Sequence, residues 1–258
     1  MEYVLNFIEK NVCITGSCRG IGRGIAIGFG SLGANVLLID IVGNITGAEE
    51  TAEMVRDVGG QATIITADLS RVEEIERVVQ EMKKKFSVLD VLINNHGITR
   101  KYETENYKEE DYDATLDTNL KGYFFMSSRV AKGYFIPQKY GKIISTASMA
   151  SFRGVVHSCA YAASKGGVKQ MTMSLACEWA KYNIQVNAVA PGYTNTKMAA
   201  NIDKSSERYK RIMCATPIQR FCEVEELVGA YLFLSSHMAN YITGHTFPVD
   251  GGGCASYV

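Results

Sequence analysis

The sequence predicts a single α/β domain of the doubly wound Rossmann type, in which helices cover both faces of a parallel sheet. Short apolar runs alternate with helical segments along the chain, a glycine-rich turn follows the first run, and no Pro-, Ser- or Gly-rich linker divides the 258 residues. Strands that alternate with helices are joined by crossovers, and crossovers make neighbouring strands parallel. We therefore expect one domain over residues 1–258.

The expected strands are short and rich in β-branched residues, which is typical of strands buried on both faces. They cover Val12–Thr15, Asn35–Asp40, Thr63–Thr66, Val91–Ile93, Lys142–Thr146, Gln185–Val189 and Thr246–Val249. Helices are expected between them over Gly22–Leu32, Ala48–Val58, Val72–Phe86 and Tyr161–Trp179. Residues near 194–215 show neither pattern, and we expect an irregular loop there that covers the substrate.

Composition excludes several classes of function. Lys plus Arg and Asp plus Glu both number 27, so the net charge of +0 gives no argument for binding nucleic acid or an anionic membrane. The chain has no apolar run of about 18 residues, and Met1–Lys10 lacks the order of an export signal. The seven cysteines form no C-x-x-C pair and the four histidines show no metal-ligand spacing. We expect a cytoplasmic protein with reduced thiols and no metal.

The glycine-rich turn predicts a phosphate site. It has the spacing G-x-x-x-G-x-G and comprises Gly16, Ser17, Cys18, Arg19, Gly20, Ile21 and Gly22. Glycines let the backbone approach a pyrophosphate, and the N-terminus of the following helix favours its charge. Asp40 ends the second strand, where a carboxylate accepts hydrogen bonds from ribose hydroxyls and repels a 2′-phosphate. We therefore expect NAD to be preferred over NADP, although Arg19 in the turn favours a phosphate.

A tyrosine and a lysine could provide the proton transfer that accompanies hydride transfer from a nicotinamide. Hydride transfer to a carbonyl needs a proton donor, and the reverse needs a base. Tyr161 and Lys165 lie four residues apart, on one face of an expected helix. A tyrosine base near neutrality would need its pKa to fall by roughly 3, which corresponds to about 4 kcal/mol. A second Tyr-x-x-x-Lys, Tyr193 to Lys197, follows Pro191-Gly192 in an expected loop.

A serine distinguishes the two copies. Ser148 lies thirteen residues before Tyr161, whereas Ala180, thirteen residues before Tyr193, has no hydroxyl to donate. We therefore expect Tyr161 and Lys165 to form the catalytic pair.

These motifs resemble the short-chain dehydrogenase/reductase family. The turn spacing, Asn94-Asn95-His96-Gly97 and Asp250-Gly251-Gly252 occur in the family's order, from about Val12 to Gly253. His96 stands where the family has alanine. The resemblance implies a catalytic tetrad in which Ser148 orients the substrate oxygen and Asn119 holds a water, together with Tyr161 and Lys165. It implies further cofactor contacts at Asp68, Leu69, Asn95, Gly97, Tyr161, Lys165, Pro191, Gly192 and Thr196.

The substrate is indicated by a likeness to one group of the family. Lys142–Gly154 and Ile98-Thr99-Arg100 are similar to sugar-acid and polyol members such as gluconate 5-dehydrogenase and 2-deoxy-D-gluconate 3-dehydrogenase. Arg100 and Arg153 follow strand ends, where a guanidinium can hold a carboxylate, and His157 lies near them. Two alternatives remain, a 3-oxoacyl carrier-protein reductase and a non-enzymatic dinucleotide sensor. Asp40 counts against the first and the tetrad against the second.

Two segments, Val168–Trp179 and Ser128–Ile136, resemble the paired helices through which family members dimerise. The tail Phe247–Val258 resembles the second interface of their tetramers. The resemblance therefore implies a homotetramer.

Overall fold

The structure is a computed structural model that describes residues 4–199 and 202–256. Three expectations, on Met1–Lys10, on 194–215 and on Phe247–Val258, thus lie partly outside the described residues.

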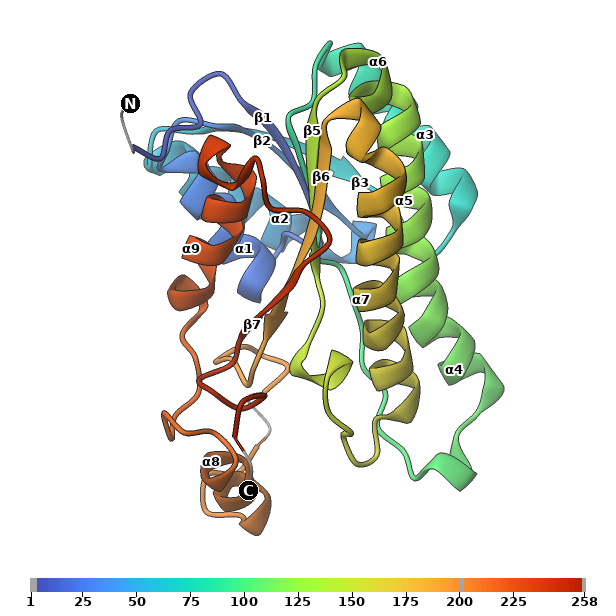
Figure 1. The fold of residues 1–258 in the computed structure, drawn as a ribbon, viewed down its shortest axis with the longest axis vertical. Helices are drawn as coiled ribbons and strands as arrows, with labels where there is room; N and C mark the ends of the chain where they lie inside the picture. The colour runs from blue at the N-terminus through green and yellow to red at the C-terminus, as the bar shows by residue number, and fades with distance from the viewer. Residues whose placement is uncertain (1–3, 200–201, 257–258) are drawn as a thin grey trace.

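Seven strands form one sheet in the order β3-β2-β1-β4-β5-β6-β7, and every neighbouring pair is parallel (Figure 1). The strands are β1 Asn11–Thr15, β2 Asn35–Asp40, β3 Gln61–Thr66, β4 Val91–Asn94, β5 Gly141–Thr146, β6 Ile184–Pro191 and β7 Thr246–Val249. All seven coincide with expected strands. In β1, β2, β4, β5 and β6, burial on both faces produces apolar runs that the sequence displays directly.

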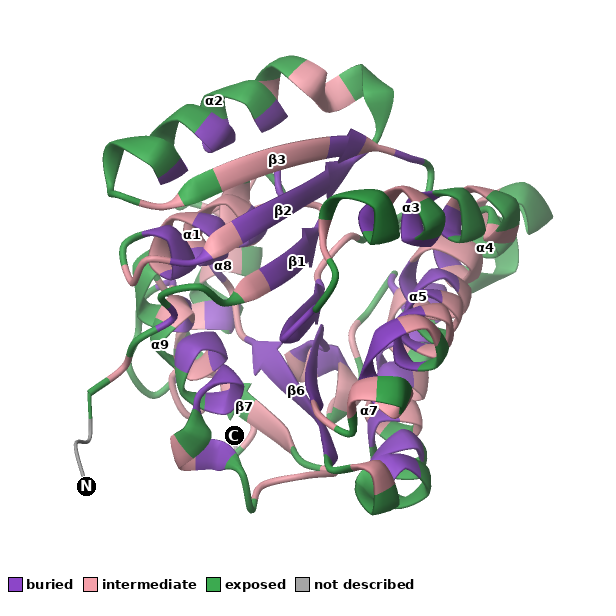
Figure 2. Cartoon of the chain, turned by 90° about the horizontal axis from the view of Figure 1, so that it is seen from above, coloured by how far each residue is buried: buried purple, intermediate pink, exposed green. Residues whose placement is uncertain are grey.

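Helices cover both faces of this sheet (Figure 2). They are α1 Gly20–Gly30, α2 Ile45–Asp57, α3 Val72–Lys85, α4 Glu109–Leu116, α5 Gly122–Val130, α6 Ile136–Gln138, α7 Cys159–Trp179, α8 Glu207–Cys214 and α9 Val224–Ser235. Two π-helical turns, Asp117–Lys121 and Ala131–Phe135, join α4, α5 and α6. Short 3-10 helices cover Val42–Asn44, Thr104–Asn106, Met149–Ser151, Ala180–Tyr182 and His237–Ala239.

The alternation of side chains along β1 shows how the two layers are filled. Val12 and Ile14 belong to the core that contains Phe29 of α1, whereas Cys13 points into the opposite core with Val78 of α3. Helices α1, α2 and α9 thus share one face, and α3, α5 and α7 share the other. The doubly wound α/β prediction is confirmed.

One expectation about the region after β6 is wrong. Residues near 194–215 are not irregular throughout, since α8 forms over Glu207–Cys214. Ser206 caps this helix, because its hydroxyl accepts a hydrogen bond of 3.1 Å from the Tyr209 backbone N–H. So short a helix offers too few periodic positions for a sequence pattern to reveal it.

The strand order places the site. The chain goes from β1 outward to β2 and β3, and then returns to β4 on the other side of β1. In such sheets ligands bind outside the carboxyl ends of the strands at this reversal. The segments that follow β1, β2, β4, β5 and β6 all leave that edge, at the end of the molecule that carries α8 (Figure 1). None of the described helices is both long enough and apolar enough to cross a membrane.

Candidate active site

The turn after β1 has the backbone that a pyrophosphate cradle needs. Gly16 and Gly20 have φ values of +64° and +55°, in the region that favours glycine. A Cβ on Gly22 would lie 2.1 Å from the Gly16 carbonyl oxygen, so no larger residue fits there. The Asn95 amide holds the turn, since its Nδ2 donates to the Gly16 carbonyl at 2.9 Å. These glycines and the N-terminus of α1 fit a dinucleotide phosphate.

Thr196 closes this turn from the other side. A Cβ on Gly20 would lie 3.4 Å from Thr196 Cγ2, so the segment after β6 reaches the turn after β1. The Gly192 backbone N–H donates to the Val249 carbonyl at 3.0 Å, which ties the same segment to β7. Two groups of expected cofactor contacts, far apart in sequence, therefore meet over the carboxyl edge.

Asp40 is fixed at the end of β2. Its carboxylate is only 8% exposed and accepts hydrogen bonds from Cys18 N at 3.0 Å, Ile41 N at 2.9 Å and Asn44 Nδ2 at 2.8 Å. The carboxylate thus joins the end of β2 to the glycine-rich turn. Burial, followed by the hydrogen bond to Asp40, raises the pKa of the Cys18 thiol to about 12. The side chain of Arg19 is exposed beside them.

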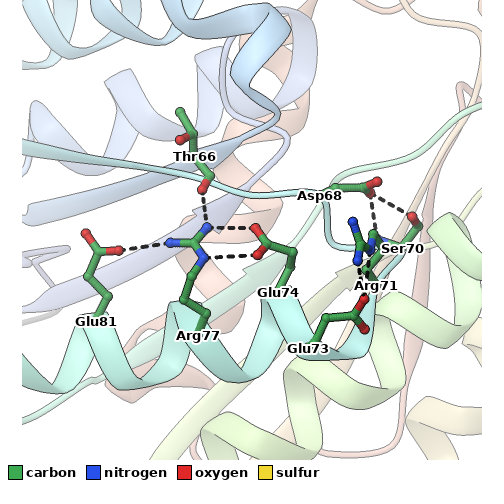
Figure 3. A network of polar contacts seen from close by, with 8 residues as sticks. All are labelled: Thr66, Asp68, Ser70, Arg71, Glu73, Glu74, Arg77 and Glu81. Carbon is green, nitrogen blue, oxygen red and sulfur yellow. Dashed lines mark hydrogen bonds and ion pairs between the residues drawn. The ribbon is translucent and has the colours of Figure 1, made fainter.

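Asp68 stands at the turn between β3 and α3 (Figure 3). Its Oδ1 accepts from Ser70 Oγ at 2.7 Å and from Ser70 N at 3.0 Å, as a turn residue before a helix does. Arg77 of α3 donates to the Thr66 carbonyl at 2.6 Å and so binds the helix to the end of β3. Asp68 is exposed, whereas Leu69 is buried.

Lys165 is a buried residue of α7 with two polar partners. It is 3% exposed, and its Nζ donates to the Thr146 carbonyl at 2.7 Å and to the Tyr123 hydroxyl at 3.3 Å. Burial lowers the pKa of Lys165 from 10.5 to about 7. The Nζ atom is 6.0 Å from the centroid of the Tyr161 ring.

Tyr161 is next to Ser148. Burial raises the pKa of Tyr161 above its ordinary value of 10.0, and the hydrogen bond from Ser148 acts in the opposite direction. Ser148 follows β5 and also accepts a hydrogen bond of 3.1 Å from the Ala150 N–H. Helix α7 and the end of β5 therefore bring Ser148, Tyr161 and Lys165 together.

Asn119 is fully buried in the π-helical turn Asp117–Lys121. Its side chain exchanges two hydrogen bonds of 2.8 Å with the backbone of Ile98, and its Nδ2 donates to Ser164 Oγ at 3.2 Å. A Cβ on Gly97 would lie 3.1 Å from Asn119 Oδ1 and 3.8 Å from Lys165 Nζ. The fourth residue of the expected tetrad thus borders the same space.

The second Tyr-x-x-x-Lys copy has different surroundings. Tyr193 lies in a loop, where its carbonyl accepts from Cys222 N at 2.9 Å and its ring stacks on Phe221 at 5.7 Å between centroids. Lys197 is exposed and does not follow Tyr193 on a helix. The spacing therefore does not place these two side chains on one helix face.

The three expected substrate residues are partly engaged elsewhere. Arg100 is 49% exposed and its Nε pairs with Asp111 Oδ1 at 3.3 Å. Arg153 Nη1 donates to the carbonyl of Gly253. His157 is exposed, and its carbonyl accepts from Tyr102 N at 3.1 Å, which links the loops after β4 and β5. Within residues 4–199 and 202–256, no three His, Cys, Asp or Glu side chains gather as a metal site would require.

Sequence reasoning missed the residues that hold Lys165. Tyr123 is fully buried in an apolar helix and reads as a core residue, and Thr146 contributes only its backbone carbonyl. Neither leaves a motif.

Comparisons with known proteins agree with this geometry. A family model described as enoyl-(acyl carrier protein) reductase matches residues 16–253. The 2-dehydro-3-deoxy-D-gluconate 5-dehydrogenase of Escherichia coli (strain K12) is 37% identical over 244 residues, which cover 94% of each chain. A putative short-chain alcohol dehydrogenase from Sinorhizobium meliloti 1021 has a TM-score of 0.93 at 33% identity, over 98% of this chain and 100% of that one.

A further solved structure bears on the cofactor. A putative NAD(P)-dependent gluconate 5-dehydrogenase from Beutenbergia cavernae, with bound NADP at low occupancy, has a TM-score of 0.92 at 35% identity and covers 98% of this chain and 99% of that one. With the match over residues 16–253 and relatives aligned over nearly their whole length, the chain belongs to the short-chain dehydrogenase/reductase family of NAD(P)-dependent oxidoreductases.

Proposed function

We propose that this enzyme is an NAD-preferring dehydrogenase that interconverts a secondary alcohol and a ketone on a gluconate-type sugar acid. The observation that carries the proposal is the convergence of Asn119, Ser148, Tyr161 and Lys165 beside the turn after β1. The substrate class is supported by the names of the relatives, which are gluconate-type dehydrogenases.

The proposed mechanism assigns one task to each residue. The nicotinamide cofactor supplies or accepts the hydride when bound. In reduction, the Tyr161 hydroxyl gives its proton to the substrate oxygen, and in oxidation the phenolate takes that proton back. Ser148 donates a hydrogen bond to the same oxygen, and the Lys165 ammonium stabilises the phenolate. Burial raises the pKa of Tyr161, so a nearby positive charge must lower that pKa for the phenolate to form. Lowering the pKa by 1 corresponds to about 1.4 kcal/mol of stabilisation of the phenolate.

The preference for NAD rests on Asp40. Its two oxygens have roughly four lone-pair sites, and the hydrogen bonds from Cys18 N, Ile41 N and Asn44 Nδ2 leave room for a ribose hydroxyl. A 2′-phosphate at the same place would meet a buried negative charge. Arg19 and the NADP in the Beutenbergia cavernae structure favour the opposite choice, so the cofactor needs a direct test.

Arg100 is the better candidate for the substrate carboxylate. Its ion pair with Asp111 is exposed and contributes less than about 1 kcal/mol, so a substrate can displace it. Arg153 is partly buried and bonded to the Gly253 carbonyl, which is harder to replace. His157 is placed to bond a hydroxyl, and residues 194–215, with α8, would cover the bound substrate. The proposed cytoplasmic location rests on the sequence, in which the seven cysteines form no C-x-x-C pair.

The decisive experiment is a substrate panel read by NADH and NADPH absorbance. It contains keto sugar acids, polyols, hydroxysteroids and acyl thioesters. We expect turnover of a keto sugar acid, with a higher kcat/KM for NADH. In the Arg100→Met variant, KM for that acid should rise about tenfold or more, because a charged hydrogen bond contributes about 1.5–3 kcal/mol, while KM for a neutral polyol stays unchanged.

An acyl carrier-protein reductase is the second candidate, because the matching family model carries that description. Preferential reduction of an acyl thioester with NADPH would establish it in place of the sugar-acid proposal.

A further inference from the structure

His96 occupies a buried position between the glycine-rich turn and the helix that carries Asn119. Its Nδ1 lies 2.7 Å from Thr15 Oγ1, at the end of β1. Its backbone closes on the turn, since a Cβ on Gly16 would lie 2.6 Å from His96 Cα. The ring is therefore anchored where the cofactor turn begins.

The other ring nitrogen faces α5. His96 Nε2 is buried and has no hydrogen-bond partner of ordinary geometry among the described residues. It lies 2.8 Å from the position that a Cβ on Gly122 would occupy, and the Leu69 carbonyl lies 2.5 Å from the same point. The imidazole edge is thus wedged against the first residue of α5, where only glycine fits.

The π-helical turn Asp117–Lys121 leaves the Thr118 carbonyl available as an acceptor near His96 Nε2. The Gly122 N–H donates to the carbonyl of Asp117, five residues back, and not to that of Thr118, four residues back as in an α-helix. The Thr118 carbonyl therefore lacks its α-helical donor. It also raises the pKa of His96, as an acceptor within reach of the ring does. A proton on Nε2 would satisfy both buried groups. The single Thr15 hydroxyl proton would then turn from the Ile93 carbonyl, 3.2 Å away, to His96 Nδ1, 2.7 Å away.

The same ring packs against a partner of Lys165. The His96 and Tyr123 rings meet edge to face, with centroids 4.8 Å apart at 62°. The Tyr123 hydroxyl receives the Lys165 hydrogen bond, and Lys165 Nζ lies 4.8 Å from the Tyr123 ring centroid. Because Tyr123 is fully buried and in contact with the His96 ring, a change at His96 alters the packing that holds Tyr123.

We propose that His96, as a neutral imidazole protonated on Nε2, is a positioning residue that locks the turn carrying Asn119 to the end of β1 and, through Tyr123, holds Lys165 beside Tyr161. Burial and then the Lys165 charge lower the pKa of His96 to about 3, while Asp40, Thr118 and Asp68 act in the opposite direction. The ring therefore stays neutral at every pH at which the enzyme works.

The first test needs no substrate. Nitrogen NMR of the protein labelled in its histidine rings should show one imidazole that stays neutral, with the proton on Nε2, between about pH 5 and 9. Its signal is assigned by its loss in the His96→Gln variant. A His96 ring that titrates in this range, or that carries its proton on Nδ1, would overturn the proposal.

The second test uses the proposed dehydrogenase activity and rests on it. The His96→Gln variant retains an amide nitrogen near the Nε2 position, whereas His96→Asn reaches only the Nδ1 position. We expect kcat to fall about tenfold in His96→Asn, equal to 1.4 kcal/mol, and much less in His96→Gln, with KM for the cofactor nearly unchanged in both. Loss of the Lys165 position should also raise the apparent pKa of alcohol oxidation by about 0.5 or more in His96→Asn.

The control is Val78→Ala, a buried change in α3 on the far side of the α3–α5 core. It should lower the melting temperature without moving the pH profile. The titratable groups that act on His96 or on the Tyr161 site remain in every variant, and they are Asp40, Asp68, Tyr123, Tyr161, Lys165 and Tyr231. An equal pH shift in Val78→Ala, or wild-type kinetics in His96→Asn, would refute the positioning role. A wild-type enzyme that turns over no panel substrate would refute the proposed function and leave the NMR test to decide on His96.

Discussion

Replacing Lys142 by Met should stabilise the fold, although the change removes a charge from a protein with no net charge. Lys142 lies near the start of β5 and is 0% exposed. Its Nζ has no hydrogen-bond partner among the described residues. Burial lowers the pKa of this lysine from 10.5 to about 8. The folded state therefore carries an ammonium that is shielded from bulk solvent and has no acceptor among the described residues.

The expected gain in the free energy of unfolding, and its dependence on pH, follow from this pKa. The difference of about 2.5 in pKa between the unfolded and folded states corresponds to about 3 kcal/mol. Because the folded pKa is the lower one, the unfolded state binds more protons between pH 8 and 10.5, and stability rises with pH in that window. Below about pH 8 the penalty is present in full. Met fills a similar volume without the charge, so Lys142→Met should gain up to about 3 kcal/mol at pH 7 and almost nothing near pH 10.5.

The assay is urea unfolding of wild type and variant at pH 7, 8, 9 and 10.5. One protein concentration is used throughout, so that the contribution of the proposed tetramer to stability would be the same in every measurement. Lys85→Met, a change at an exposed lysine of α3, is the matched control and should leave stability unchanged. A Lys142→Met protein that is less stable at pH 7, or whose gain does not shrink between pH 8 and 10.5, would show that Nζ has a stabilising partner and would refute the reasoning.

Three further predictions concern the site and the assembly. Tyr161→Phe should lower kcat by about 100- to 10,000-fold, the range for general acid–base groups, with NADH binding by fluorescence largely kept, whereas Tyr193→Phe should retain most activity; equal losses would mean that the wrong tyrosine has been chosen. Asp40→Ser should lower kcat/KM for NAD about tenfold or more and leave that for NADP unchanged or higher, and a wild-type preference for NADP would transfer the cofactor role to Arg19. Light scattering at micromolar concentration should give four times the chain mass of 28.3 kDa, and a monomer mass would exclude the proposed homotetramer.

The fold could be predicted from the sequence because its signals are local. A parallel strand buried on both faces must be apolar along its length, so β2 and β6 can be recognised as apolar runs in the sequence. Helix α8 and the π-helical turn at Asn119 are not visible in this way. Helix α8 is a single short amphipathic segment. The π-helical turn differs from an α-helix only in that each N–H donates to the carbonyl five residues back and not four.

The site was predicted less completely, for a physical reason. The sequence could single out Tyr161, Lys165 and Ser148 as candidates because the proposed chemistry requires particular side chains at particular spacings. It could not single out the groups that hold them, because they act through backbone or ring contacts. Thr146 offers Lys165 a carbonyl that any residue would provide, and Tyr123 contributes a hydroxyl from within a buried helix. The engagement of Arg153 by Gly253 depends on where the C-terminal turn packs, a contact one hundred residues away in sequence.

Lys142 and Lys165 show why burial alone does not identify a functional residue. Both are lysines with nearly no exposed surface, and burial lowers the pKa of both. The difference lies in their surroundings. Lys165 has two hydrogen-bond acceptors and lies 6.0 Å from the ring of Tyr161, whereas Lys142 has no acceptor among the described residues. A buried cation costs several kcal/mol of stability wherever it is placed. At Lys165 that cost accompanies a geometry that can lower the pKa of a tyrosine, and the proposed role of Lys165 rests on this pairing and not on its burial.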